Sequence, residues 1–236
     1  MDDPFPAGLL PSVEKFFESE HTRVAGENLY PEIFLTELFF PLQRQRELSK
    51  MMETAREYKP KVVYEIGADK GGGLYHFCKS LPTVTRVIAC EVRGTPYQHL
   101  FERAFPHIDF LWLAESSYGV EAVNRIKEWL GSDTLDVVFI DGDKSAFVLD
   151  FDTVKPMMSK SSVVFMHDIT DPAPGEAFNV ILQRKIGKCS RIVDQTDATE
   201  ACQREREGIP STGSHEGWLR HWRGQSCGVG VIRLSE

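Results

Sequence analysis

Acidic side chains follow short apolar runs at four places in the middle of the chain. In chain order these acids are Glu65, Glu91, Asp141 and Asp168. If the apolar runs are neighbouring strands, the acids meet at one edge of a sheet. Crowded carboxylates repel one another unless a cation or a cationic ligand lies among them. The pattern therefore predicts a site for a positively charged ligand.

A glycine-rich turn begins at the first of these acids. Residues 65–71 read Glu-Ile-Gly-Ala-Asp-Lys-Gly, and a glycine backbone allows a ligand to approach closely. A dinucleotide-binding turn needs a second glycine where Asp69 stands, and a carboxylate there repels phosphate. The turn therefore argues against a phosphate-bearing cofactor. The sulfonium and ammonium groups of S-adenosylmethionine suit its negative charge.

Two later stretches, FIDGDKSAF and FMHDIT, add groups that can bind a metal ion or move a proton. The carboxylates of Asp141 and Asp168 suit Mg²⁺, and the imidazole of His167 is compatible with Mn²⁺ or another transition metal. Lys144 is a candidate base, because a nearby cation would lower its pKa. Plainer interpretations stay open: Asp141 could cap the following turn. The His167–Asp168 pair could order a loop, and Lys144 could simply be solvated.

These residues must be positioned by an alternation of strands and helices that begins at residue 61. Predicted strands cover residues 61–67, 86–92, 108–116, 135–143 and 161–169, with a closing pair at 190–195 and 228–234. Predicted helices cover residues 73–82, 96–105, 119–131, 146–158 and 175–187. In the third of these helices, the spacing places Val120, Val123 and Leu130 on the apolar face. The strand runs are almost continuously apolar, as in strands buried on both faces. The expected fold class is α/β, with a Rossmann-like, doubly wound and mostly parallel sheet of seven strands.

The two ends of the chain differ from this alternation. Residues 1–58 are expected to form a helical arm, and residues 59–236 the domain that carries the site. Residues 195–226 are polar but hold Trp218 and Trp222, so we expect a lid or insertion there rather than a plain loop. The apolar segment EIFLTELFF, residues 32–40, suits either a homodimer contact or packing on its own domain.

The composition argues against several classes of protein. The chain has 236 residues, of which 42% are hydrophobic, which is enough for one good core. The net charge of −8 argues against a nucleic-acid partner. No apolar run approaches the length of a membrane span, and the start MDDPFPAGLL lacks the features of a signal peptide. The five cysteines form no CxxC pair and fit a reducing compartment. We therefore expect a cytoplasmic protein with no membrane partner.

Over about residues 45–190 the chain resembles the class I S-adenosylmethionine-dependent methyltransferases. Their first motif is acid-x-Gly-x-x-x-Gly, which residues 65–71 match. The resemblance implies that Glu91 binds the ribose hydroxyls, since two acceptor oxygens suit a vicinal diol. It also implies that the stretch AESS lies beside the adenine. The residues it assigns to the cofactor are Glu65, Gly67, Ala68, Asp69, Gly71, Glu91, Glu115, Ser116 and Asp141.

The stretch IDGDKSAF further resembles part of the metal-dependent O-methyltransferases of the catechol and caffeoyl-coenzyme A kind. That resemblance implies Asp141 and Asp168 as metal ligands, His167 as a third ligand or a base, and Lys144 as the base that takes the acceptor's proton. The family has an Asp-Asn pair where this chain has His167-Asp168, which moves the chain toward the cephalosporin-hydroxylase-like group. The implied function is methyl transfer from S-adenosylmethionine to a hydroxyl of a small, natural-product-like acceptor. The expected ion is a divalent metal, Mg²⁺ first.

Three alternatives remain beside this interpretation. A cephalosporin-hydroxylase-like oxygenase on the same fold would use Asp141, His167 and Asp168 as iron ligands, although such sites normally have two histidines and one carboxylate. A non-catalytic S-adenosylmethionine-binding protein would have no need for the full set of acids. A nicotinamide-dependent oxidoreductase is disfavoured by Asp69 in the glycine turn.

Overall fold

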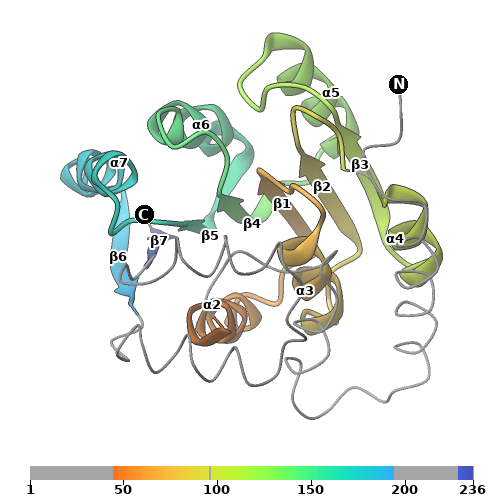
Figure 1. Ribbon diagram of the computed structural model, residues 1–236, viewed down its shortest axis with the longest axis horizontal. Helices are drawn as coiled ribbons and strands as arrows, with labels where there is room; N and C mark the ends of the chain where they lie inside the picture. The colour runs from red at the N-terminus through yellow and green to blue at the C-terminus, as the bar shows by residue number, and fades with distance from the viewer. Residues whose placement is uncertain (1–44, 96, 194–227, 236) are drawn as a thin grey trace, which may run out of the picture.

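The computed structural model describes residues 45–95, 97–193 and 228–235, which form a seven-stranded sheet between two layers of helices (Figure 1). The strand order is β3-β2-β1-β4-β5-β7-β6. The strands are β1 (Val62–Ile66), β2 (Arg86–Cys90), β3 (Asp109–Leu113), β4 (Leu135–Ile140), β5 (Met158–Met166), β6 (Gly187–Ile192) and β7 (Val229–Leu234). The strands β1 to β5 pair in parallel. In contrast, β7 runs antiparallel between β5 and β6. The predicted α/β fold with a mostly parallel sheet is confirmed.

Helices cover both faces of the sheet. They are α2 (Gln45–Glu57), α3 (Gly72–Ser80), α4 (Gln98–Ala104), α5 (Val120–Leu130), α6 (Phe147–Val154), the short 3-10 helix η2 (Lys155–Met157) and α7 (Pro172–Gln183). Figure 1 shows α5, α6 and α7 on one face, and α2 and α3 on the other. Successive strand residues alternate between the two faces, so Val63 packs on the side of α2 to α4 and Tyr64 on the side of α5 to α7. Both faces are therefore buried, which explains the almost continuous apolar runs.

The strand order brings the acidic strand ends together. The order reverses between β1 and β4, and in open α/β sheets ligands bind outside the carboxyl ends at such a reversal. Backbone hydrogen bonds continue past the strand ends: Gly67 N–H donates to Cys90 O at 2.8 Å, Asp141 N–H to Ile66 O at 2.9 Å, and His167 N–H to Ile140 O at 3.0 Å. The loops after β1, β4 and β5 therefore start side by side.

Helix α2 is the only part of the predicted arm within the described residues. Its side chains Leu48, Met51, Met52 and Ala55 are buried in the same core as α3. The rest of the arm, with the segment 32–40, and all of the predicted lid lie outside the described residues, so the domain boundaries stay predictions. Among the described helices, none combines the length and the apolar character that a membrane crossing requires.

The prediction for the apolar face of α5 was wrong at its first position. Val120 is 76% exposed, whereas Ala122, Ile126 and Leu130 are buried. These three lie four residues apart, so they share one side of the helix, and that side packs on the sheet.

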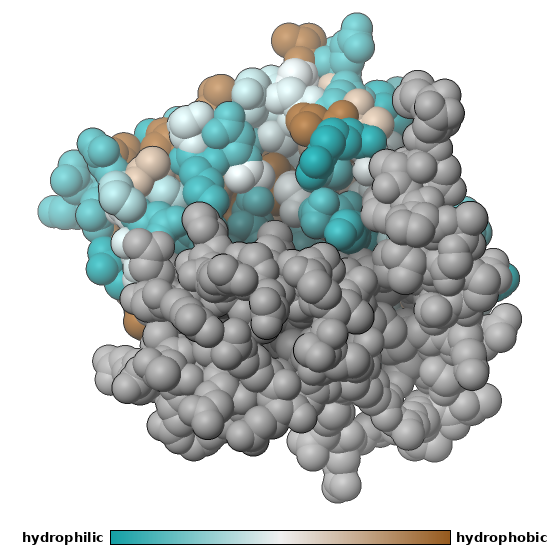
Figure 2. All heavy atoms as spheres, in the orientation of Figure 1, coloured by the Kyte–Doolittle hydropathy of each residue, from teal (hydrophilic) through white to brown (hydrophobic). Residues whose placement is uncertain are grey.

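Figure 2 shows apolar residues in separate small groups among hydrophilic ones on the described part of the face in view. The predicted homodimer contact at residues 32–40 lies outside the described residues and stays a prediction.

Candidate functional site

The turn after β1 contains glycines because other groups approach its backbone closely. Gly67 has a φ of +83°, and a Cβ there would lie 2.4 Å from the carbonyl oxygen of Asp141. Gly71 has a φ of +94° and precedes the first turn of α3. A Cβ on Gly73 would lie 2.3 Å from Oε1 of Glu65. Close packing of the backbone thus explains the glycines at positions 67 and 73. The contact at Gly67 also holds this turn against the loop after β4.

Glu65 is a buried carboxylate with an unsatisfied oxygen. Its side chain lies on the α3 side of the sheet and is 2% exposed. Among the described residues, Oε2 has no hydrogen-bond partner. Burial, and then repulsion from Asp141 and Asp69, raise the pKa of Glu65 well above its usual value. A buried polar group without a partner is costly, so this carboxylate is suited to a cationic ligand.

Glu91 lies directly against the glycine turn. The Asp69 N–H donates to Glu91 Oε2 at 3.3 Å, and the backbone N–H of Arg93 donates to Oε1 at 3.2 Å. The Arg93 side chain also reaches Glu91 Oε1 at 3.4 Å and Asp69 Oδ1 at 3.5 Å, but it is 80% exposed. Exposed ion pairs contribute little stability, so a ligand can displace this arginine readily. Ala68 is buried, and its N–H donates to Cys90 O at 3.2 Å.

Glu115 and Ser116 follow β3, as predicted, but the Glu115 side chain is already paired. Arg125 of α5 donates from Nη1 to Glu115 Oε1 at 2.6 Å. The carbonyl of Ser116 accepts from Gly119 N–H at 2.9 Å. Glu115 and Ser116 therefore lie just after β3, and their place beside the adenine stays a prediction.

A buried hydroxyl–carboxyl pair next to these residues has no signal in the sequence. The Ser117 hydroxyl donates to Asp150 Oδ1 at 2.5 Å, and both side chains are buried. Burial raises the pKa of Asp150 to about 6, although the Ser117 hydrogen bond acts in the opposite direction. Asp150 lies inside the predicted helix 146–158, where its spacing gives no hint of a polar role.

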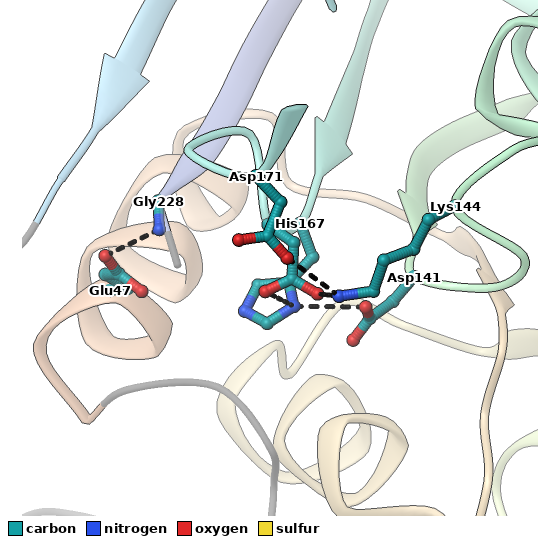
Figure 3. A network of polar contacts seen from close by, with 7 residues as sticks. Glu47, Asp141, Lys144, His167, Asp171 and Gly228 are labelled. Atoms are coloured by element: carbon teal, nitrogen blue, oxygen red, sulfur yellow. Dashed lines mark hydrogen bonds and ion pairs between the residues drawn. The ribbon is translucent and has the colours of Figure 1, made fainter. Parts of the chain in front are cut away.

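Asp141, His167 and Asp168 meet at the ends of β4 and β5. One potential ligand atom from each residue lies within 4.8 Å of the other two. His167 Nδ1 is 3.0 Å from Asp141 Oδ1 and 3.3 Å from Asp168 Oδ1. Figure 3 shows the His167 ring with Asp141 on one side, while Glu47 and Gly228 lie on the other side in this view. The predicted trio is thus gathered in one place.

The charges in this trio stabilise one another. Burial acts to lower the pKa of His167, but the charges and hydrogen bonds of Asp141 and Asp168 raise it to about 10. Burial likewise acts to raise the pKa of Asp168, and His167 with Lys144 holds it well below its usual value. Within the described residues, His167 Nε2 is buried without a hydrogen-bond partner.

Lys144 bridges two carboxylates at the outer side of the trio. Its Nζ contacts Asp168 Oδ2 and lies 3.4 Å from Asp171 Oδ2. Burial acts to lower the pKa of Lys144, but Asp168 and then Asp171 outweigh it and raise that pKa. The sequence predicted a lowered pKa for Lys144 on the condition that a cation lies beside it. Without that cation, the neighbouring carboxylates raise the pKa of Lys144. Sequence reasoning missed Asp171, which directly precedes α7.

Two of the four non-glycine residues with positive φ in the described part of the chain lie in these loops, and the other two are Lys59 and Lys185. Asp69 and Asp168 have φ values of +42° and +56°, in the left-handed region that side chains other than glycine rarely adopt. Such residues gather at functional sites, where the surroundings hold them in place. The neighbouring Asp143 is different, because its Oδ1 accepts from the N–H and the hydroxyl of Ser145 and so caps the turn before α6.

Comparisons with known proteins connect this fold to one class of enzymes. No protein-family model matches the sequence, and no curated protein sequence matches it. An O-methyltransferase from Streptomyces achromogenes involved in tomaymycin synthesis, in complex with S-adenosylmethionine, has a similar structure, with a TM-score of 0.58 and 13% identity. The likeness covers 95% of this chain and 96% of that one.

Two further solved structures agree. An O-methyltransferase from Bacillus cereus in complex with S-adenosylhomocysteine has a TM-score of 0.53 and 13% identity, over 98% of this chain and 92% of that one. An S-adenosylhomocysteine-bound methyltransferase from Podospora anserina has a TM-score of 0.52 and 15% identity, over 100% of this chain and 99% of that one. At these identities the likeness establishes the fold, which is the one that these methyltransferases share.

Proposed function

We propose that the protein is an S-adenosylmethionine-dependent methyltransferase that methylates a hydroxyl group of a small molecule, with a divalent metal ion. The observation that carries the proposal is the clustering of acids at one edge of the sheet: Glu65 near the end of β1, Glu91 after β2, and the Asp141–His167–Asp168 trio after β4 and β5. The shared fold with proteins that bind S-adenosylmethionine or its product supports the same choice of cofactor.

The cofactor half of the site would be formed by the loops after β1 and β2. Bound S-adenosylmethionine supplies a methyl group on a positively charged sulfonium. Glu65, with its unsatisfied buried oxygen, would balance the cofactor's positive charge, and Glu91 would accept hydrogen bonds from the ribose hydroxyls once Arg93 moves aside. Gly67 keeps the turn close to the loop after β4, which brings the two halves of the site together.

The donor set of the trio fits a divalent ion. Neighbouring ligands of an octahedral ion at about 2.1 Å are separated by about 3.0 Å. The separations of His167 Nδ1 from Asp141 Oδ1 and Asp168 Oδ1, 3.0 and 3.3 Å, are close to that value, and a bound ion would replace the proton that Nδ1 shares with the two carboxylates. Two carboxylates favour Mg²⁺, while the imidazole extends the choice to Mn²⁺. Such an ion, when bound, would lower the pKa of an acceptor hydroxyl.

Lys144 is the better candidate for the base. Its side chain is 47% exposed at the edge of the trio, whereas that of His167 is 3% exposed and its Nδ1 is held between two carboxylates. With a divalent ion bound beside it, which would lower its pKa, a neutral Lys144 would take the proton from the acceptor hydroxyl. The oxygen would then form its new bond to the methyl group as the sulfonium–methyl bond breaks, and the sulfur would leave as the neutral thioether of S-adenosylhomocysteine. Positioning both reactants on adjoining loops supplies the proximity that such a transfer needs. A natural-product phenol or sugar is the proposed acceptor class.

Calorimetry with S-adenosylhomocysteine tests the proposal. We expect the wild-type protein to bind this product, and Glu91→Gln to weaken binding by about 10- to 100-fold, because one charge-assisted hydrogen bond contributes about 1.5–3 kcal/mol. Asp109→Asn, at the exposed opposite end of the sheet, is the matched control. Wild-type protein that binds NAD instead of S-adenosylhomocysteine would contradict the proposal.

A further inference from the structure

Glu47 is a buried carboxylate that the proposed chemistry does not use. It lies in the first turn of α2, far from the strand ends in sequence, and is 0% exposed. Its Oε1 accepts a hydrogen bond of 3.0 Å from the backbone N–H of Gly228, 181 positions further along the chain. Burying a carboxylate is unfavourable unless it is hydrogen-bonded, so this contact calls for an explanation.

Gly228 continues the connection to the loop that follows β5. The Gly228 carbonyl accepts from Ile169 N–H at 3.3 Å. A Cβ on Gly228 would lie 3.0 Å from Thr170 Cγ2 and 3.2 Å from Ile169 Cγ1, so its backbone is packed directly on this loop. Its φ of +65° gives a second reason for glycine at this position.

The loop that Gly228 supports is the turn bearing Asp168. Asp171 N–H donates to Asp168 O at 2.8 Å and closes the turn at residues 168–171. Asp168 holds a φ of +56° in this turn, a conformation that the surroundings must stabilise. Figure 3 shows Glu47 and Gly228 joined on one side of His167, with Lys144 and Asp141 on the other.

We propose that Glu47 is a positioning residue for the metal half of the site. Its carboxylate fixes Gly228 at the start of β7, and Gly228 in turn holds the turn 168–171, which presents Asp168 to His167 and Lys144. The hydrogen bonds described above for the cofactor half, on the loops after β1 and β2, involve neither Glu47 nor Gly228. The inference therefore concerns the metal half of the site and not the cofactor half. Only the measurement of metal affinity rests on the proposed function.

Four forms of the full chain test this inference: the wild type, Glu47→Ala, Glu47→Gln and Glu53→Ala. Glu53 lies on the same helix, but its side chain is 58% exposed and pairs with Lys50, so it is the matched control. Glutamine keeps an oxygen that accepts from Gly228 N–H and loses only the charge. Amide hydrogen exchange at residues 168–171 and 228 is the first readout, and it needs neither a metal ion nor activity.

We expect Glu47→Ala to speed exchange at these amides by about tenfold or more, the change that corresponds to about 1.4 kcal/mol. Glu47→Gln should restore most of the protection, and Glu53→Ala should match the wild type. By calorimetry, the dissociation constant for Mn²⁺ should rise by about tenfold in Glu47→Ala, while that for S-adenosylhomocysteine stays within about twofold.

The inference would be overturned if the amide exchange rates of Glu47→Ala matched those of Glu53→Ala. It would also be overturned if Glu47→Ala lost affinity for Mn²⁺ and for S-adenosylhomocysteine equally, because that result indicates a general loss of structure. If Glu47→Ala does not fold, Glu47→Met, which keeps the bulk of the side chain and removes the acceptor oxygen, takes its place: faster exchange confined to residues 168–171 and 228 supports the inference, and uniform or unchanged exchange refutes it. If the wild type binds neither Mn²⁺ nor S-adenosylhomocysteine, the proposed function fails, and the exchange data still decide the role of Glu47.

Discussion

Replacing Glu65 with glutamine should stabilise the free protein and weaken cofactor binding at the same time. Glu65 is 2% exposed and its pKa is raised well above the usual value, first by burial. A carboxyl with a raised pKa stabilises the fold fully below its unfolded pKa of about 4.5, and this stabilisation is lost as the pH rises through the folded pKa. Glutamine imitates the neutral form, so the advantage of Glu65→Gln should appear at neutral and alkaline pH.

The size of the effect follows from the charge, because glutamine leaves the same buried position without a partner but uncharged. The gain is the extra cost of burying the charged form over the neutral one, about 1–3 kcal/mol. For a protein of this size each kcal/mol shifts the melting temperature by about 3 °C, so we expect a gain of about 3–9 °C at pH 8. At pH 4.5 the gain should nearly vanish. The ammonium group of S-adenosylhomocysteine loses its counter-charge, so its affinity should fall by about tenfold or more.

Thermal unfolding at pH 4.5 and pH 8, with calorimetry at pH 8, measures both effects. Glu53→Gln on the exposed side of α2 is the control, and it should change neither quantity. A Glu65→Gln protein that melts below the wild type at pH 8 and binds S-adenosylhomocysteine with wild-type affinity would refute the reasoning. That result would mean that Glu65 is a structural carboxylate already satisfied in the free protein.

Three further changes test other parts of the site. Gly67→Ala should lower the free energy of unfolding, measured by urea denaturation, by about 3 kcal/mol, because Gly67 has a φ of +83° and a Cβ there would lie 2.4 Å from Asp141 O. The control Gly131→Ala should cost about 1–2 kcal/mol, because Gly131 has a φ of +61° but open space around it. Equal losses in the two variants would contradict this explanation. Asp150→Asn should raise the free energy of unfolding by up to about 3 kcal/mol at pH 8 and leave it unchanged at pH 3.5. The reason is that a folded-state pKa raised to about 6 destabilises the fold only at a pH above the pKa of the unfolded chain. A lower free energy of unfolding for Asp150→Asn at pH 8 would show that the ionised form of Asp150 is the stable one. Lys144→Met should reduce methyl transfer to an active acceptor by about 100-fold without changing S-adenosylhomocysteine affinity, and unchanged turnover would remove Lys144 as the base.

The sequence was sufficient to predict the sheet and the gathering of the acids. Strands buried on both faces leave almost continuous apolar runs, and parallel strands end at one edge, so Glu65, Glu91, Asp141 and Asp168 were predicted to come together. The packing of Glu65 against Gly73, which explains one of the glycines, depends on how α3 sits on β1 and was not readable from spacing.

Other features depended on contacts between distant segments. The pairing of Glu115 with Arg125 and that of Glu47 with Gly228 join residues that no local pattern connects. The prediction for α5 counted Val120 as buried because valine is apolar. Val120 lies two positions before the buried Ala122, about 200° around the helix, so its side chain is on the opposite side. Local periodicity gives the period of a helix more reliably than the side that faces the core.

A crystal of the protein soaked with S-adenosylhomocysteine and Mn²⁺, and measured at a wavelength where manganese scatters anomalously, tests the central claim most directly. We expect one anomalous peak within about 2.3 Å of atoms of Asp141, His167 and Asp168, with the ribose of the product within hydrogen-bond distance of Glu91. A peak elsewhere with the trio unchanged, or a product molecule bound away from the carboxyl edge of β1 and β2, would contradict it.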